Sequence, residues 1–194
     1  MSTQTASEAP TRFVNGLDSQ ALGATVDAIQ KDRTLARFEF RAANQWLGGA
    51  MNRSTIQGFF GAGAEDRSRT TPFKVISSEP PLLLGFNEGP NPGEYLLHAL
   101  AACVTTTTVL RAAALGIRLE SMSSEIVGDI DLQGFLDFDK SVPVGFQQLR
   151  LRVKIDADCS PAELDALLEF ARTHSPVYDT LTRPVPVILE RVSR

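Results

Sequence analysis

The stretch from Gly89 to Cys103, GPNPGEYLLHALAAC, most constrains how this chain can fold, because a rigid turn leads directly into a long apolar segment. Asn91 can cap a helix, Pro92 suits the first helical position, and Glu94 completes a capping-box pattern three residues after the cap. Apolar residues at helical spacing continue up to Gly116, which is a natural stop. We therefore predict a helix of roughly six turns with a cysteine in its middle.

The length, composition and net charge of the chain limit the classes of protein to which it can belong. The chain has 194 residues, of which 43% are hydrophobic and 22% charged, and this suits one folded domain with a substantial core. The net charge of -4 and the absence of a basic cluster argue against binding to nucleic acid or to an anionic membrane. We expect no membrane helix, because no apolar run reaches the ~18 to 20 residues that one needs, and the first ten residues do not resemble a secretory signal. We expect a cytoplasmic protein.

The few cysteines and histidines limit metal and disulfide chemistry. The cysteines are Cys103 and Cys159, and the histidines are His98 and His174. Two cysteines cannot form a disulfide framework, and these four residues lack metal-ligand spacing. We expect neither a metal ion nor a cofactor.

The N-terminal part of the chain predicts one amphipathic helix. Residues Asp18 to Lys31 carry Leu22, Val26 and Ile29 at helical spacing. This apolar stripe must pack on the main body or on a partner subunit. We therefore expect residues 1–34 to comprise a disordered tail and one helix.

The next segment predicts a β-hairpin. Residues Ala36 to Arg41 alternate between apolar and charged side chains, which is typical of a half-buried strand. The glycine-containing segment Trp46 to Asn52 predicts a turn, and Ile56 to Phe60 a second strand. In this interpretation Arg53 lies where the hairpin turns.

The C-terminal half predicts more strands and a second helix. Residues Ile126 to Leu132 and Leu149 to Ile155 alternate as strands do, and Val185 to Val192 predicts a final strand at a sheet edge, because Pro184 and Pro186 precede or interrupt it. A capping box at Ser160-Pro161-Ala162-Glu163 predicts a helix that ends near His174. Ser175 to Tyr178 is interpreted as a break and a short turn.

An apolar segment lies between the two long strands. Residues Gly134 to Gly145 carry Phe135 and Phe138, with turn residues at both ends. The segment is either a lid over an apolar pocket, to which His174 would also contribute, or a hairpin tip packed against a neighbour.

These residues carry a family resemblance. The stretch GPNPGEYLLHALAAC, followed about seventy positions later by His174-Ser175-Pro176-Val177, resembles the OsmC/Ohr family over roughly Leu35 to Val192. The resemblance implies an α+β fold in which antiparallel sheets wrap long central helices in an intertwined homodimer. Residues 35–194 would be the OsmC-like domain, with the N-terminal helix as an addition.

The resemblance also implies an activity. The better-known branches of the family are thiol peroxidases that reduce organic hydroperoxides. Cys103 matches their peroxidatic cysteine, Glu94 matches a glutamate at the start of that helix, and Arg53 matches, more loosely, an arginine that holds the thiolate. Ser175 stands where those branches place a second, resolving cysteine, so this chain belongs to a branch that lacks it. Cys159 has no claim to that role.

Each of these residues also has a structural interpretation. The reactive form of a cysteine is the thiolate, a minority at neutral pH, so Cys103 needs a nearby cation; otherwise it is a small residue packed in a helix interface. Glu94 lies nine residues before Cys103, on the opposite face of the helix and about 13 Å along its axis, so it caps its own helix or orients an arginine across the dimer. His98 points away from Cys103, and His174 either approaches the thiol or simply ends its helix.

The sequence thus predicts a cysteine-based peroxidase that reduces organic hydroperoxides with Cys103 and an external thiol reductant. The alternative is a non-catalytic protein of the same fold that binds a small apolar ligand at the dimer interface. In both cases the expected partner is a second copy of the chain, with no nucleic acid and no membrane.

Overall fold

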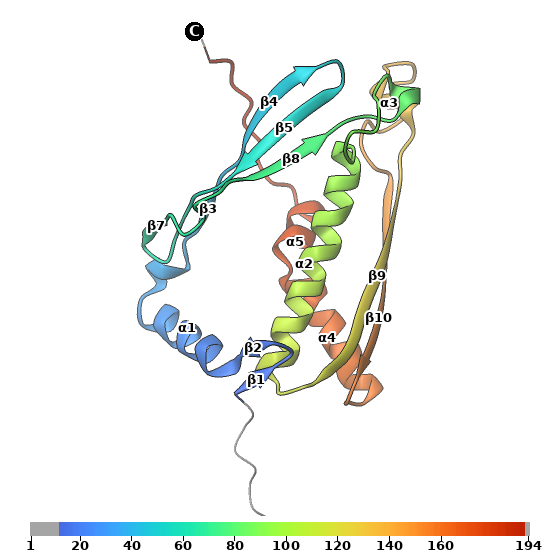
Figure 1. Cartoon of the computed structure of the whole chain (residues 1–194). Helices are drawn as coiled ribbons and strands as arrows, with labels where there is room; N and C mark the ends of the chain where they lie inside the picture. The colour runs from blue at the N-terminus through green and yellow to red at the C-terminus, as the bar shows by residue number, and fades with distance from the viewer. Residues whose placement is uncertain (1–11, 193–194) are drawn as a thin grey trace, which may run out of the picture. The chain divides into compact units, whose positions relative to one another are not determined.

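The computed structural model describes residues 12–192 (Figure 1). The chain forms two compact units: one comprises residues 18–96, and the other comprises residues 97–194 with the N-terminal residues up to Leu17. Helices and antiparallel strands occur in both units, so the protein has the predicted α+β fold. We refer to these as the sheet unit (18–96) and the helix unit, and each is described by itself.

The sheet unit contains two small antiparallel sheets. One has the strand order β4-β5-β8 and the other has the order β3-β6-β7. Their strands are β3 (Glu39–Phe40), β4 (Ala43–Gly48), β5 (Met51–Ile56), β6 (Phe59–Gly61), β7 (Ala64–Asp66) and β8 (Phe73–Ser77). The helical segments of this unit are α1 (Ser19–Lys31) and the short 3-10 turns η1 (Arg33–Ala36) and η2 (Pro81–Leu83).

The hairpin around Arg53 differs from the prediction. The turn lies at Gly49 and Ala50, where β4 ends and β5 begins, and Arg53 sits in the middle of β5 opposite Gln45 and Ile76. Of the predicted first strand, Ala36 to Arg41, only Glu39 and Phe40 form a strand, since Ala36 is the last residue of η1 and β3 pairs with β6 at two positions only. The prediction that Arg53 lies at the turn was wrong.

The N-terminal helix is confirmed. It runs from Ser19 to Lys31, and the Asp18 side chain caps it by accepting hydrogen bonds from the backbone N–H groups of Gln20 and Ala21. None of its side chains is buried within the chain.

A small hairpin precedes this helix and belongs to the helix unit. Its strands are β1 (Phe13–Val14) and β2 (Leu17–Asp18), and its turn residue Asn15 has a left-handed backbone with φ of 53°. The Asn15 side-chain amide donates to the carbonyl of Ile117 and accepts from the N–H of Leu119, both at 2.9 Å. The amide thus bonds the start of β9 as a neighbouring strand would.

The helix unit is built on a central helix and a long ribbon. The main elements are α2 (Pro92–Ala114, which starts in the sheet unit), β9 (Leu119–Asp129), α3 (Leu132–Phe135), β10 (Gln148–Ala157), α4 (Pro161–His174) and α5 (Pro176–Thr182). β9 and β10 pair as an antiparallel ribbon, which confirms the strand predicted at Leu149 to Ile155. The strand predicted at Ile126 to Leu132 is confirmed only up to Asp129, because Leu132 begins α3.

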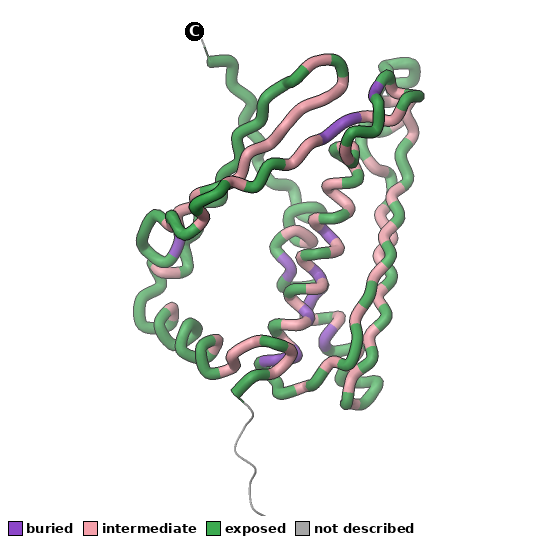
Figure 2. The backbone as a smooth tube through the Cα atoms, in the orientation of Figure 1, coloured by how far each residue is buried: buried purple, intermediate pink, exposed green. Residues whose placement is uncertain are grey.

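The core of the helix unit lies between the ribbon and the helices. Leu100, Val104 and Ala171 are buried together. Five partly buried side chains pack against them: Ile126, Leu149, Leu151, Val177 and Tyr178. Buried positions accordingly gather on α2 and α4 (Figure 2).

Helix α2 is long and apolar enough to cross a membrane by length and composition alone, which differs from the expectation that no apolar run reaches that length. The core helix of a soluble protein passes the same test, and the packing of Leu100 and Val104 against β9, β10 and α4 is that of a core helix.

Three predictions for the C-terminal half needed correction or detail. Ser175 to Tyr178 is not a simple turn, because Ser175 starts the additional helix α5. Residues 185–192 form no strand, since they have no partner strand within the described chain and Pro186 lacks an N–H to donate. The segment Gly134 to Gly145 begins in the short helix α3 and continues as bends, with Phe135 and Phe138 exposed.

Candidate active site around Cys103

The start of α2 is a complete capping box. The Asn91 side chain accepts from the N–H of Glu94, and the Glu94 carboxylate accepts from the N–H of Asn91, both at 2.8 Å. The Tyr95 hydroxyl donates to the carbonyl of Ile76 at 2.6 Å and ties this helix start to β8. Glu94 therefore has the structural role of capping its own helix.

Cys103 lies three turns further along α2 as a free, half-buried thiol. Its neighbours in the helix, Leu100 and Val104, are buried in the core of the helix unit. The hydroxyls of Thr107 and Thr108 donate to the carbonyls of Cys103 and Val104, both at 2.8 Å. These back-bonds explain how a run of threonines fits in the middle of a helix.

Ser175 occupies the junction between α4 and α5 and is completely buried. Its N–H donates to the carbonyl of Ala171 at 2.9 Å and ends α4, while its hydroxyl accepts from the N–H of Tyr178 at 3.4 Å and starts α5. The position at which the family resemblance predicts a second cysteine thus holds a hydroxyl that caps a helix.

The same junction packs against the turn of α2 that carries Cys103. Ala171, Val177 and Tyr178 surround Ser175 in the chain, and they contact the cluster formed with Leu100 and Val104. The structure therefore brings the two motifs of the family resemblance into one region of the helix unit.

His174 is held in a stack that the sequence did not predict. Its ring lies 3.9 Å from the Phe170 ring and nearly parallel to it, and the Arg111 guanidinium lies over Phe170 at 4.6 Å. Its Nδ1 lies 2.8 Å from the Thr173 hydroxyl and 3.1 Å from the carbonyl of Phe170. These contacts agree with the interpretation of His174 as a helix-ending residue. The spacing of Phe170 and His174, four residues apart in one helix, could have indicated their stack, whereas the Arg111 contact depends on how α2 meets α4.

Cys159 differs from Cys103 in its surroundings. Burial, followed by the nearby carboxylates of Glu163 and Asp158, raises the pKa of the Cys159 thiol. The thiolate is disfavoured there, so Cys159 is a poor nucleophile.

Arg53 belongs to the sheet unit. It is half-buried in β5, and one of its guanidinium N–H groups donates to the Gln45 side chain at 3.1 Å. Its contact with a cysteine remains a prediction from the family resemblance.

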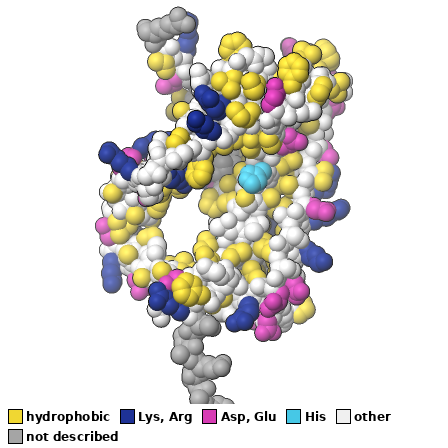
Figure 3. Space-filling view, in the orientation of Figure 1, with side chains coloured by type: hydrophobic (Ala, Val, Ile, Leu, Met, Phe, Trp, Pro, Cys, Tyr) yellow, Lys and Arg dark blue, Asp and Glu magenta, His cyan; other side chains and the backbone are white. Residues whose placement is uncertain are grey.

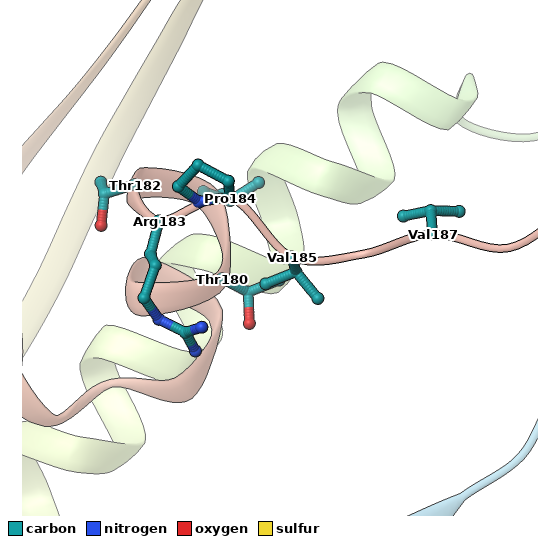
Figure 4. A pocket seen from close by; sticks show the side chains of 7 residues that line it. Thr180, Thr182, Arg183, Pro184, Val185 and Val187 are labelled. Atoms are coloured by element: carbon teal, nitrogen blue, oxygen red, sulfur yellow. The ribbon is translucent and has the colours of Figure 1, made fainter.

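Two open cavities lie elsewhere. One, of about 440 Å³, is lined by residues 180–185 and Val187 at the end of α5 (Figure 4). The other, of about 340 Å³, is lined by Arg41, Ala42, Ala43, Thr55, Gln57 and Gly58. Neither includes Phe135, Phe138 or His174, so the apolar pocket inferred from those residues also remains a prediction. Among residues 12–192, no three His, Cys, Asp or Glu side chains come together as a metal site.

Comparisons with known proteins identify the class and then the family. Three solved structures share the α+β fold. An OsmC-like protein from Mycoplasma pneumoniae is 18% identical with a TM-score of 0.56, covering 75% of this chain and 88% of that one. A putative osmotic stress induced and detoxification response protein from Psychrobacter arcticus 273-4 is 14% identical with a TM-score of 0.55, covering 72% and 85%. An OsmC-like protein of unknown function from Vibrio cholerae is 16% identical with a TM-score of 0.51, covering 73% and 92%.

The model of the OsmC-like protein family matches residues 85–190, more than half of the chain and including both Cys103 and Ser175. No curated protein matches the sequence. The chain belongs to the OsmC-like protein family.

Proposed function

We propose that this protein is a thiol-dependent peroxidase that reduces organic hydroperoxides with a single reactive cysteine, Cys103. The observation that carries the proposal is the placement of Cys103: a free thiol on the central helix of an OsmC-like protein, in the turn against which the α4–α5 junction packs. The detoxification response named for the Psychrobacter relative is in keeping with this chemistry.

The proposed reaction has two halves. The Cys103 thiolate attacks the distal oxygen of the hydroperoxide, so an S–O bond forms, the O–O bond breaks, and the alkoxide leaves and takes a proton to become the alcohol. An external dithiol then attacks the sulfenic sulfur, water leaves, and the second thiol releases Cys103 and a disulfide of the reductant.

The reductant must come from outside because neither remaining candidate is a resolving thiol. Ser175 is a buried capping hydroxyl, and Cys159 has a raised pKa. We further propose that Arg53 holds the thiolate, that Glu94 caps its helix, and that the protein works in the cytoplasm, where reduced thiols are abundant.

We also propose that the protein acts as a homodimer. Among residues 12–192, all six buried hydrophobic side chains lie in the helix unit, and none lies in the sheet unit. Small sheets need a covered apolar face for stability, so a second copy is the simplest cover. Hydrophobic side chains reach much of the visible surface (Figure 3).

The second candidate function is a non-catalytic binder of a small apolar ligand. It is favoured by the apolar neighbours Leu100 and Val104 on either side of Cys103, and by the exposed rings of Phe135 and Phe138. In that case Cys103 is only a small side chain packed in the helix interface, with no chemical role.

One experiment separates the two functions. In a Cys159→Ser background, we expect Cys103 to be alkylated at pH 7 faster than free cysteine, and cumene hydroperoxide to be consumed in the presence of dithiothreitol. Mass spectrometry after peroxide treatment should show the gain of one oxygen on Cys103. Cys103→Ser is the control for both readouts. Alkylation no faster than free cysteine, together with no turnover, would contradict the peroxidase.

A second substitution tests the placement of the two family motifs. Ser175→Cys should form a disulfide with Cys103 on oxidation, if the packing of the α4–α5 junction on α2 brings the two side chains together. The absence of that disulfide would contradict their proximity.

A further inference from the structure

A run of four threonines, residues 105–108, begins two positions after Cys103 in α2. The hydroxyl of Thr107 donates to the carbonyl of Cys103, and that of Thr108 donates to the carbonyl of Val104, both at 2.8 Å. A hydroxyl carries one proton, so neither of these threonines has a further proton to donate. The helix backbone therefore uses the donor capacity of half of the run.

The other two threonines keep a free donor. In the part of the chain that the structure describes, the hydroxyls of Thr105 and Thr106 bond neither to the backbone nor to another side chain. Thr106 is exposed, and Thr105 is half-buried. Each of these hydroxyls thus keeps its proton available for another acceptor.

Helix geometry decides which of the free hydroxyls can reach the thiol. Residues three apart on a helix are neighbours on its surface, with Cβ atoms about 5 to 6 Å apart, whereas residues two apart do not face each other. Helical side chains also lean toward the preceding turn, so the side chain of Thr106 leans toward Cys103. Thr105, two residues after the cysteine, lies on a different side of the helix. Thr106 therefore combines a position beside the thiol with a hydroxyl that is free to donate.

Cys103 lies at the boundary between the packed side and the open side of α2. Leu100 and Val104 are buried in the core, whereas Ala102 and Thr106 are exposed. At about 100° per residue, the exposed pair lies on one side of Cys103 and the buried pair lies on the other. The core of the helix unit thus does not fill the side on which the Thr106 hydroxyl lies.

We propose that the Thr106 hydroxyl donates a hydrogen bond to the Cys103 thiolate and is a second catalytic residue of this site. The inference rests on the proposed function and names a residue that supports its nucleophile. The structure contains no hydrogen bond between these two side chains. Rotation about the Cα–Cβ bond of Thr106 would form one without breaking another, because no existing bond holds its hydroxyl.

The physical reason for this role is the charge of the acceptor. A hydrogen bond to an ionised acceptor is stronger than one to a neutral acceptor, so the hydroxyl favours the thiolate over the thiol. Because the thiolate is the nucleophile, a larger fraction of Cys103 is then reactive at neutral pH. Thr106 keeps its own proton while the sulfur attacks the hydroperoxide.

The alkylation rate of Cys103 in a Cys159→Ser parent tests this hydrogen bond. Thr106→Val keeps the branched shape of the side chain and removes the hydroxyl. We expect alkylation at pH 7 to slow roughly two- to fivefold, because fewer thiols are ionised while each remaining thiolate is somewhat more nucleophilic. At about pH 10, where the thiol is largely ionised in either protein, Thr106→Val should react at least as fast as the parent.

Two further variants serve as controls. Thr106→Ser retains the hydroxyl without the methyl group and should keep the rate of the parent at pH 7. Thr105→Val removes the other free hydroxyl, which lies on a different side of the helix, and should also leave the rate unchanged. Circular dichroism verifies that each variant is folded.

Several results would overturn the role of Thr106. These are an unchanged rate in Thr106→Val at pH 7, an equal slowing in Thr105→Val, and a rate in Thr106→Ser as low as that in Thr106→Val. A slowing that persists at about pH 10 would show that valine obstructs the thiol, and it would overturn the role as well.

Consumption of cumene hydroperoxide is measured separately, so that failure of this inference can be told from failure of the proposed function. A parent that turns over, with alkylation unchanged in Thr106→Val, would remove Thr106 from the site and leave the peroxidase intact. A parent without turnover would count against the peroxidase, whereas the alkylation rates would still decide whether Thr106 supports the thiolate.

Discussion

At the scale of single residues, Ser175 has a local structural role as the residue that caps α5. Its hydroxyl caps the first turn of α5, and the residue is completely buried. Ser175→Ala removes this cap and should lower the free energy of unfolding by about 1 kcal/mol. Urea denaturation measures the change, and Ser123→Ala, at an exposed position of β9, should stay within about 0.5 kcal/mol of wild type. Equal stability of Ser175→Ala and wild type would contradict the capping role.

Asn15 is a second residue with a structural role, because its amide makes two hydrogen bonds to the start of β9. Asn15→Gly keeps a backbone that tolerates the left-handed φ and removes only the amide. We expect a loss of about 1 to 3 kcal/mol in unfolding free energy, since both bonded groups are partly buried.

Hydrogen exchange locates the effect of Asn15→Gly, because the N–H of Leu119 should lose its protection. The control is Asn87→Gly, at an exposed asparagine with a similar φ of 56°. Unchanged exchange at Leu119 would show that the amide does not anchor β9.

At the scale of elements, the loop between β8 and α2 has a pH dependence that can be predicted. The Ser78 hydroxyl, followed by the backbone N–H groups of Glu88 and Phe86, lowers the pKa of the Glu88 carboxyl from its usual 4.5. Because the folded pKa is below the unfolded one, the carboxylate stabilises the loop above about pH 4.5, and this stabilisation is lost as the pH falls through the folded value.

Hydrogen exchange of Asn87, whose N–H donates to the carbonyl of Glu79, reports on this loop. After correction for the intrinsic pH dependence of exchange, its protection should fall on acidification in the wild type. In Glu88→Gln it should be weaker at neutral pH and nearly independent of pH. A wild-type loop equally protected at pH 3 and pH 7 would argue against the role of Glu88.

The elements also show what could be predicted from the sequence. Helices α2 and α4 were predicted with their starts because the capping boxes at Asn91 and Ser160 are local signals. The strand register around Arg53 was not predicted correctly, because it depends on the turn between β4 and β5 and on the pairing of β5 with β8. The strand predicted at residues 185–192 is missing since a strand needs a partner, which the described chain does not supply.

The candidate site, too, was predictable from the sequence only in part. Cys103 and Ser175 were placed from motif resemblance, and the packing of Val177 and Tyr178 on the core cluster agrees with their proximity. The contact of Arg111 with Phe170 was missed because it forms only when α2 meets α4. The stack of Phe170 and His174 lies within α4, where the spacing of four residues is a local signal that was not used.

At the scale of the whole molecule, folding and association should be coupled. The described part of the sheet unit contains no buried hydrophobic side chain, so it gains little stability from a core of its own. If a second copy supplies the cover, then unfolding also dissociates the dimer, and stability depends on protein concentration.

Thermal denaturation at two concentrations tests this coupling. Raising the concentration 100-fold should add about 2.7 kcal/mol of apparent stability. The two chains of the dimer share this gain, so for chains of this length it corresponds to an increase in Tm of roughly 3 to 5 °C. A wild-type Tm independent of concentration, with a monomeric mass, would mean that the sheet unit is stable without a partner, and the homodimer would have to be abandoned.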